Sequence, residues 1–251
     1  MLGKTFVHVP GVGEKTEHRL WGQGAHSWEH FLAEPTRFPL PDARLAEAIE
    51  IVSRSLTARQ RLDHRFFAER LKPGDHWRAL PEFADRTAYL DIETDGGRGP
   101  DCVTVIGLYR KGEVQQFIRG ENLLAFPDAL EEVSLLVTFF GTGFDLPVLR
   151  ETFPRLRFEQ LHVDLCPTLR RLGFRGGLKR IERELGIGRS GDTVHLVGSD
   201  APRLWSEWLW GHRESRDRLL RYNAEDIVNL APLAELAYER LARKLEAGGA
   251  D

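Results

Sequence analysis

A short apolar segment, RTAYLDIETDGG (residues 86–97), carries two carboxylates two positions apart, Asp91 and Glu93. Successive side chains of a β-strand point to opposite faces, so residues i and i+2 share a face. Asp91 and Glu93 would therefore project side by side from one face of a buried strand. Two like charges placed there repel each other and lose hydration unless something positive lies between them. The segment therefore predicts a buried strand whose acidic face needs a positively charged partner.

The composition is that of an ordinary globular protein, with 251 residues of which 41% are hydrophobic and 29% charged. The sequence contains no run of about 18 apolar residues and no N-terminal secretory pattern, so we expect no membrane partner. Its two cysteines, Cys102 and Cys166, lie far apart and outside any CxxC pair, which favours a reducing, cytoplasmic location. The nine histidines form no HxH or HExxH motif, so nothing supports a zinc site.

Charge is distributed unevenly along the chain, although the formal net charge is only −3. The stretch from Arg150 to Arg189 contains ten basic and five acidic residues. Such a stretch is typical of a phosphate-facing surface, and it is equally compatible with a solvated helix face.

The first 80 residues are predicted to form a small helical region. Apolar spacing predicts one helix over 41–56 and a second over 57–71, the second opened by a capping box of Thr57 and Gln60. A linker over 72–86 follows. We therefore expect an N-terminal region over 1–80 and a larger domain over 84–246.

The pattern changes to strands after the linker. AYLDIET (88–94), CVTVIGLYR (102–110) and VQQFIRG (114–120) are separated by turn signals and predict an antiparallel meander. A buried strand is expected at the end of 130–143, a short one at 161–165, helices within 144–153, 169–174 and 178–187, and a last helix from about Arg216 to Glu246. This order predicts an α/β fold with a mixed sheet flanked by helices.

Two further acidic residues are candidates for the same site. Asp145 follows the strand LLVTFF through a glycine-containing turn, and Asp226 lies in the last helix one turn after Tyr222, on the same helix face. Four converging carboxylates provide an oxygen-rich site for two hard divalent cations, and a set without Cys or His favours Mg²⁺ or Mn²⁺. Two such ions about 4 Å apart stabilise the attacking and leaving oxygens of a phosphoryl displacement.

These residues carry a family resemblance. DIET, the FD after a glycine-containing turn, and YxxxD resemble, in order, the three motifs of the DEDD exonuclease superfamily, which has a ribonuclease H-like fold. Tyr222 four residues before the final Asp, where position 221 is Arg, resembles the DEDDy branch. The segments FDLPVL, LKRIERELGI and YNAEDIVNL are similar to YprB-type ribonuclease H-like proteins, and the similarity covers roughly residues 84–240.

The resemblance implies a two-metal nuclease that removes nucleotides from 3′ ends. Our first hypothesis is a 3′–5′ exonuclease that acts on DNA, at single-stranded or frayed ends. The resemblance assigns Asp91, Glu93, Asp145 and Asp226 as ligands of two Mg²⁺ or Mn²⁺ ions, and Tyr222 as the group that orients the attacking water. We expect nucleic-acid contacts at Thr94, Phe144 and Lys179. The alternatives are a non-catalytic nucleic-acid-binding or adaptor protein on the same fold, or an endonuclease or RNase variant.

One departure from the family pattern falls just before the second motif. Proteins of this kind usually carry Asn-Gly there, whereas this chain has Phe140-Gly141. Asp145 itself is intact. The departure puts the contacts to the substrate end in question.

The N-terminal segment HVPGVGEKTEHRL (8–20) resembles the hairpin of a helix-hairpin-helix module. Gly11 and Gly13 would form a turn whose backbone N–H groups approach a phosphate, and Lys15 would add charge. The alternative is a plain glycine-containing turn before a helix. The aromatic residues that follow, Trp21, Trp28 and Phe31, are expected in a core rather than as a base-stacking surface.

Overall fold

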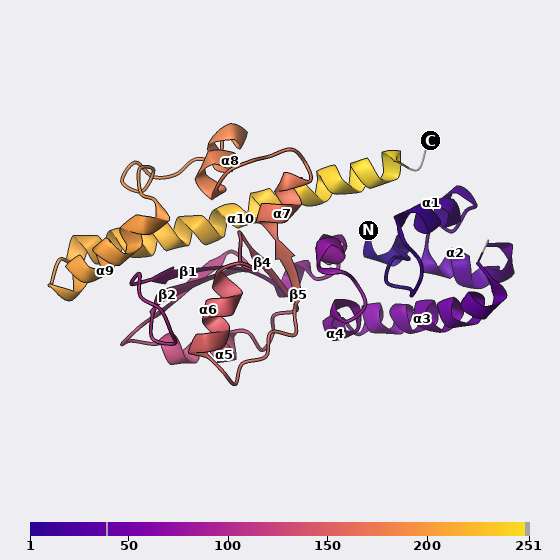
Figure 1. Ribbon diagram of the computed structural model, residues 1–251, viewed down its shortest axis with the longest axis horizontal. Helices are drawn as coiled ribbons and strands as arrows, with labels where there is room; N and C mark the ends of the chain where they lie inside the picture. Colours follow the sequence, from indigo (N-terminus) through magenta and orange to yellow (C-terminus); the bar gives the residue numbers. More distant parts are fainter. Residues whose placement is uncertain (39, 249–251) are drawn as a thin grey trace. The chain divides into compact units, whose positions relative to one another are not determined.

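The computed structural model describes residues 1–38 and 40–248 (Figure 1). The chain forms two compact units. The first comprises residues 1–84, 159–163 and the chain from Tyr238 on; the second comprises Asp85–Phe158 and Asp164–Ala237. The first unit is therefore not continuous in sequence.

The first unit is built from short helices. The α-helices are α1 (Glu14–Gly22), α2 (Trp28–Ala33), α3 (Asp42–Gln60) and α4 (His64–Ala68), with 3₁₀ turns at Leu2–Lys4, Pro35–Arg37, Pro73–Ala79 and Ala84–Arg86. Trp28 and Phe31 are fully buried, and Trp28 stacks on Phe67 with ring centroids 6.0 Å apart. The prediction that these two aromatic residues belong to the core is confirmed.

The predicted division of residues 41–71 into two helices at Thr57 is wrong. A single helix, α3, runs through Thr57 to Gln60 because its buried positions Val52, Ser55 and Ala58 continue at helical spacing across that point. The chain turns instead at Leu62, which has a φ of 52°. Asp63 then caps α4 by accepting a hydrogen bond from the Phe66 N–H (3.2 Å).

The chain forms a five-stranded mixed sheet, as the sequence predicts, and its first four strands belong to the second unit. The strands are β1 (Thr87–Thr94), β2 (Val103–Arg110), β3 (Glu113–Ile118), β4 (Leu135–Thr138) and β5 (Leu161–Asp164), in the order β3-β2-β1-β4-β5. β1, β2 and β3 form the expected antiparallel meander, whereas β1 and β4 pair in parallel. β1 is thus a central strand with a neighbour on each edge.

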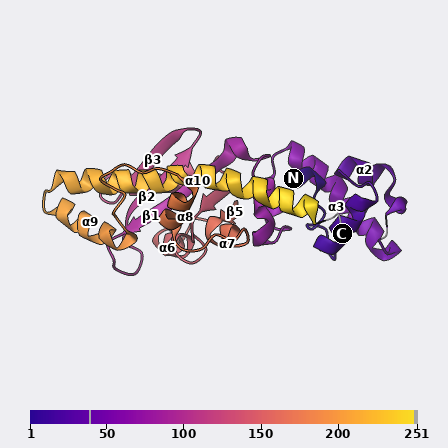
Figure 2. The ribbon, with the colours of Figure 1, turned by 90° about the horizontal axis from the view of Figure 1, so that it is seen from above.

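Helices cover both faces of this sheet (Figure 1). α5 (Phe126–Ala129) and α6 (Asp145–Thr152) pack on one face against a core that includes Leu90, Ile92 and Ile106. α10 (Arg213–Ala247) lies over the opposite face, and Figure 2 shows it running across the strands. The remaining helices are α7 (Leu165–Arg170), α8 (Leu178–Leu185) and α9 (Ala201–Leu209), with 3₁₀ turns at Leu123–Ala125 and Gly198–Asp200.

The long final helix is no membrane span. Within residues 1–38 and 40–248, no helix combines the length and apolar character needed to cross a bilayer. The two cysteines are free, Cys102 buried and Cys166 half-buried.

Candidate metal centre

The alternation of β1 separates its apolar and acidic side chains. Leu90 and Ile92 are buried in the core beneath α6, so Asp91 and Glu93 point to the face that α10 covers. Glu93 is only 5% exposed and Asp91 is half-buried. The prediction that the two carboxylates share one face of a buried strand is confirmed.

A close approach of α10 to the sheet brings Asp226 to this pair. Asp91 lies opposite Gly107 of β2, and a β-carbon on Gly107 would lie 2.2 Å from Asn223 Oδ1 of α10. The missing side chain lets the Asn223 amide donate to Asp91 Oδ2 (3.3 Å). One carboxylate oxygen each of Asp91, Glu93 and Asp226 then lies within 4.8 Å of the others.

Asp145 adjoins this group without being one of the three. It is the first residue of α6 and is 2% exposed. Its Oδ1 accepts a hydrogen bond from the backbone N–H of Ile92 (3.2 Å), the residue between Asp91 and Glu93. The four predicted acids therefore gather from β1, α6 and α10.

The cluster is electrostatically strained when no cation is bound. Burial, followed by the charges of three neighbouring carboxylates, raises the pKa of Asp91 well above its usual value. Burial and then the charges of Asp226 and Asp145 do the same to the pKa of Glu93. Burial raises the pKa of Asp145 to about 7 and that of Asp226 to about 6. Some of these carboxyl groups therefore remain protonated near neutral pH.

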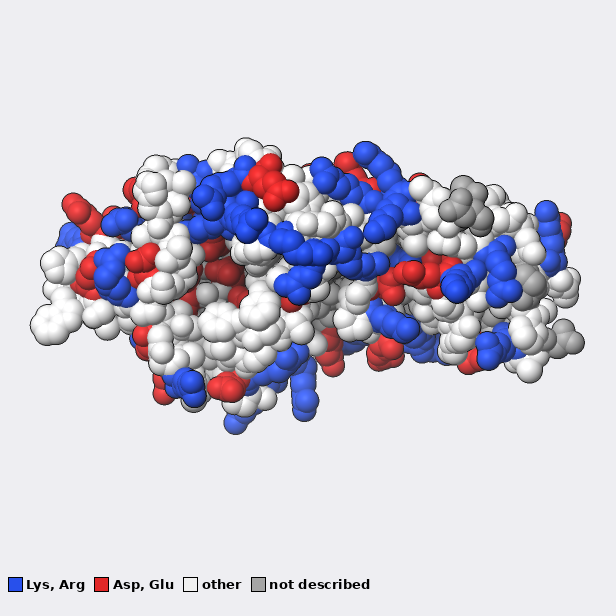
Figure 3. All heavy atoms as spheres, turned by 45° about the horizontal axis from the view of Figure 1, so that its top comes forward, with Lys and Arg blue, Asp and Glu red and all other residues white. Residues whose placement is uncertain are grey.

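Two basic side chains from the α8 region border the acids. Arg189 is 4% exposed and places Nη2 2.5 Å from Asp226 Oδ1, while Nε and Nη2 donate to both oxygens of buried Glu182 (2.6 Å each). Lys179 Nζ is buried and has no hydrogen-bond partner among the described residues; it lies 4.2 Å from the centroid of the Tyr222 ring. Figure 3 shows acidic side chains at the base of a hollow in the second unit, with Lys and Arg along its border.

Arg189 therefore corrects one interpretation of the basic stretch at 150–189. Its guanidinium faces neither a free phosphate surface nor solvent, because it is buried between Glu182 and Asp226. A count of charges along the sequence does not distinguish a buried ion pair such as this one from charges on the surface.

Tyr222 lies one turn before Asp226 on α10 and is 6% exposed. Its ring packs with Val105 and Trp205 in the core beneath α9 and α10. Burial, followed by the charges of Asp226 and Glu93, raises the pKa of its hydroxyl far above the usual value. The hydroxyl therefore stays protonated at any physiological pH and can donate or accept a hydrogen bond beside the acids.

The donor set fits a hard divalent cation. Three carboxylates converge, and Glu93 Oε1 is buried without a hydrogen-bond donor in the part of the chain that the structure describes. An unsatisfied buried carboxylate oxygen is unfavourable unless a cation coordinates it. Asp91, Glu93 and Asp226 could therefore hold a metal ion, with oxygen ligands of the kind that Mg²⁺ and Mn²⁺ prefer.

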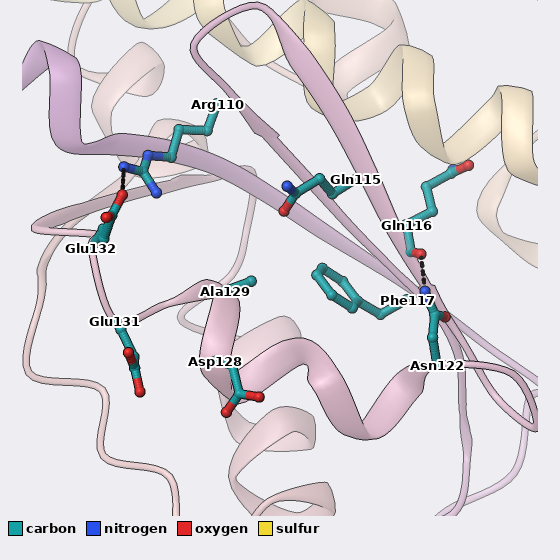
Figure 4. Close-up of a pocket in the computed structure, with 9 residues that line it drawn as sticks. All are labelled: Arg110, Gln115, Gln116, Phe117, Asn122, Asp128, Ala129, Glu131 and Glu132. Carbon is teal, nitrogen blue, oxygen red and sulfur yellow. Dashed lines mark hydrogen bonds and ion pairs between the residues drawn. The ribbon is translucent and has the colours of Figure 1, made fainter.

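A separate pocket of about 620 Å³ lies on β3 and the segment after it, and it contains none of the predicted site residues (Figure 4). Its acidic residues Asp128, Glu131 and Glu132 are exposed, and Glu132 pairs with Arg110 (2.6 Å). The Gln116 side chain points away from this pocket, toward α10, where it donates to Asn223 Oδ1 (3.1 Å). Because its charges are solvated or paired, we place the chemistry at the acidic cluster.

The predicted nucleic-acid contacts fall in different places. Thr94 ends β1, and Phe144, which is 42% exposed, is the residue before Asp145. Gly11, Gly13 and Lys15 belong to the first unit. Gly11 has a left-handed φ of 74° and Gly13 is the N-cap of α1, but the element before this turn is a three-residue 3₁₀ helix. Phosphate binding by this turn stays a prediction.

Comparison with protein families matches residues 88–238, more than half of the chain, to the RNase_H superfamily. The chain belongs to the RNase_H superfamily. The matched range includes all four acids and Tyr222, and it agrees with the predicted ribonuclease H-like fold.

Among solved structures, the chain is similar to the family B DNA polymerase from the hyperthermophilic archaeon Pyrobaculum calidifontis. The two share 19% identity with a TM-score of 0.49, over 60% of this chain and 24% of the polymerase chain. The chain therefore spans about a quarter of that polymerase. No curated protein matches the chain.

Sequence reasoning missed three residues of this site. Asn223 follows Tyr222 directly, yet nothing in the sequence indicates that Gly107 of β2 lies opposite it. Arg189 and Glu182 are seven residues apart across the end of α8, a spacing that carries no signal of a buried pair. These three residues share one feature, which only the tertiary structure shows. Each is a buried polar or charged residue, and such residues need a hydrogen-bonding or charged partner.

Proposed function

We propose that the chain is a divalent-metal-dependent nuclease of the DEDDy type, a 3′–5′ exonuclease that hydrolyses phosphodiester bonds in DNA. The observation that carries the proposal is the convergence of three carboxylates within 4.8 Å, with Asp145 beside them, in an RNase_H superfamily fold. A buried cluster of like charges is costly for folding and is typical of a site selected for chemistry.

In this proposal Asp91, Glu93, Asp145 and Asp226 hold two Mg²⁺ or Mn²⁺ ions. When bound, such ions neutralise charge on the transferred phosphoryl group and activate the nucleophile. The protonated Tyr222 hydroxyl orients the attacking water. Lys179, whose buried Nζ lacks a hydrogen-bond partner among the described residues, is positioned to bind a phosphate oxygen of the substrate.

A second candidate is a non-catalytic nucleic-acid-binding protein on the same fold. It is favoured by the ion pair between Arg189 and Asp226 (2.5 Å), which neutralises one of the acids with the chain's own cation. The pairing of the same guanidinium with buried Glu182 argues against this candidate. Glu182 already balances the charge of Arg189, so most of the charge of the acidic cluster stays uncompensated.

Cleavage of end-labelled oligonucleotides separates the candidates. Substrates labelled at the 5′ or the 3′ end, of DNA and RNA, single-stranded and duplex, are incubated with Mn²⁺, with Mg²⁺ and with EDTA. We expect a ladder of products shortened from the 3′ end, and none in EDTA. Binding without cleavage under every metal condition would support the non-catalytic candidate, and undiminished cleavage in EDTA would refute the metal-dependent one.

A further inference from the structure

The turn from β4 to α6 holds an exposed aromatic residue in a strained conformation. Phe140 has a φ of 66°, in the left-handed region that a bulky residue rarely adopts. Its side chain is 56% exposed, so burial does not offset the strain. A backbone outlier of this kind costs about 1–3 kcal/mol and persists only where the surroundings hold it.

Hydrogen bonds fix this conformation from both sides. The Phe140 N–H donates to Asp164 Oδ1 (2.8 Å) and the Thr142 N–H donates to Asp164 Oδ2 (3.0 Å). The Phe140 carbonyl accepts from the N–H groups of Gly143 (3.0 Å) and Phe144 (3.1 Å). The turn is therefore rigid, and the direction of the Phe140 side chain is set by it.

The ring packs on the segment that leads into α6. A β-carbon on Gly143 would lie 2.5 Å from Phe140 Cζ, so the ring packs against the backbone of Gly143, two residues before Asp145. Phe144, also exposed, stands between them in the sequence. An exposed aromatic surface thus lies at the turn that leads into Asp145, at a position where an apolar side chain contributes little to the core.

We propose that Phe140 is a specificity-determining residue that stacks on the unpaired terminal base of a single-stranded DNA substrate. Every base has a π-face, and stacking on an aromatic side chain stabilises a single strand without reading its sequence. This inference rests on the proposed function, because it assigns the substrate end that enters the acidic site.

A double-mutant cycle measures the stacking directly. The affinities of wild-type protein and Phe140→Asn are measured by fluorescence anisotropy in Ca²⁺, which offers the site a divalent cation. The probes are two short oligodeoxynucleotides labelled at the 5′ end, one with a 3′-terminal thymine and one with an abasic 3′ terminus. Asn tolerates the left-handed conformation, so this variant removes the ring and keeps the turn.

Wild-type protein should bind the thymine-ended probe about fivefold to a hundredfold more tightly than the abasic one, as expected for one stacked base. Phe140→Asn should show no such preference, and Phe140→Trp should restore it. Trp210→Ala is the matched control, since Trp210 is 84% exposed in the same unit, three residues before α10 begins. It should retain the wild-type preference.

If removal of the terminal base lowered the affinity equally in the wild-type protein and in Phe140→Asn, the inference would be overturned. The cycle does not depend on cleavage, so it separates the two proposals. Stacking at Phe140 without metal-dependent cleavage would contradict only the proposed hydrolysis. Cleavage from 3′ ends without any Phe140-dependent base preference would contradict only the stacking.

Discussion

Glu17 in the first unit and the acidic cluster in the second unit are carboxylates buried in opposite ways. In the first unit, Glu17 is fully buried among hydrogen-bond donors: it accepts from Thr5 Oγ1 (2.7 Å), from the Phe6 N–H (2.6 Å) and from Arg78 Nη1 (2.7 Å). In the second unit, the carboxylates of β1, α6 and α10 face one another, and Glu93 Oε1 has no donor in the described chain.

The difference distinguishes a structural acid from a functional one. A carboxylate whose lone pairs are filled by donors joins the segments around it and has no capacity left for a ligand. A group of carboxylates that repel one another destabilises the fold, and it is maintained where a cation or a reaction uses it. We therefore expect substitutions in the two regions to have opposite effects on stability and on activity.

The largest expected effect is on the stability of the first unit. Glu17→Gln should lower the free energy of unfolding by about 3–5 kcal/mol, because it removes the closer of the two carboxylates, Glu17 and Asp75, that pair with buried Arg78. Chemical denaturation monitored by circular dichroism measures this. Glu14→Gln, an exposed acid of the same helix, serves as control and should change little. If Glu17→Gln left the denaturation midpoint unchanged, Glu17 would not be a stabilising structural acid.

The next effect is on the proposed chemistry of the second unit. Asp91→Asn should lower the cleavage rate at least about a hundredfold to a thousandfold, the scale of losing one electrostatic stabiliser of a transition state. Asp128→Asn, an exposed acid in the pocket of Figure 4, should cleave at the wild-type rate. The assignment of Asp91 is wrong if single-turnover rates of the two variants are alike.

A smaller loss is expected at Tyr222. Tyr222→Phe removes only the hydroxyl. It keeps the ring, which packs with Val105 and lies under the Lys179 ammonium group. Turnover should fall by about tenfold or more, with the melting temperature and substrate affinity little changed. Tyr109→Phe is the control for removing a tyrosine hydroxyl in the same sheet. Full activity of Tyr222→Phe would leave the four acids as candidates and reject the DEDDy-type role of the tyrosine.

A further effect is a pH dependence of stability without metal. The pKa of Asp145 is raised from 3.8 to about 7, so the folded state binds more protons than the unfolded state between these values. Stability of the metal-free protein should therefore fall as pH rises from about 4 to about 7, and urea midpoints across that range measure it. Saturating Mn²⁺ should reverse the trend, since metal binding requires deprotonated ligands.

Within the cluster, Asp91 and Asp226 should also differ. Asp91→Asn removes a charge that the neighbouring carboxylates repel, so the metal-free protein should become more stable above neutral pH. Asp226→Asn weakens the ion pair with buried Arg189 and should lower stability. Equal shifts of the urea midpoint in the two variants would contradict this division.

Much of the fold was predictable because its signals are local. The alternation in TAYLDIET, the turns between the first three strands and the helical spacing of FDLPVLRETF define elements within a few residues of the observed ones. The predicted break at Thr57 failed because tertiary burial of Ser55 and Ala58 continues the helix past a locally good cap. The discontinuous first unit, with residues 159–163, has no local signal.

The site was predictable to the same extent. Spacing indicated that Asp91 and Glu93 share a face and that Tyr222 and Asp226 share another. The contact of Arg189 with Asp226 and the fit of Asn223 against Gly107 depend on how α8 and α10 approach the sheet, and sequence spacing holds no such information. The strain at Phe140 likewise follows from the hydrogen bonds of Asp164, which lies twenty-four residues later in the chain.

The most direct test of the metal centre is an isothermal titration of the protein with Mn²⁺ above neutral pH. The wild-type protein and Asp128→Asn should bind Mn²⁺ saturably and alike, and Asp91→Asn should bind at least about tenfold more weakly because one ligand charge is lost. Saturable binding that Asp91→Asn leaves unchanged, or the absence of binding in the wild-type protein, would contradict a divalent-cation site at Asp91, Glu93 and Asp226.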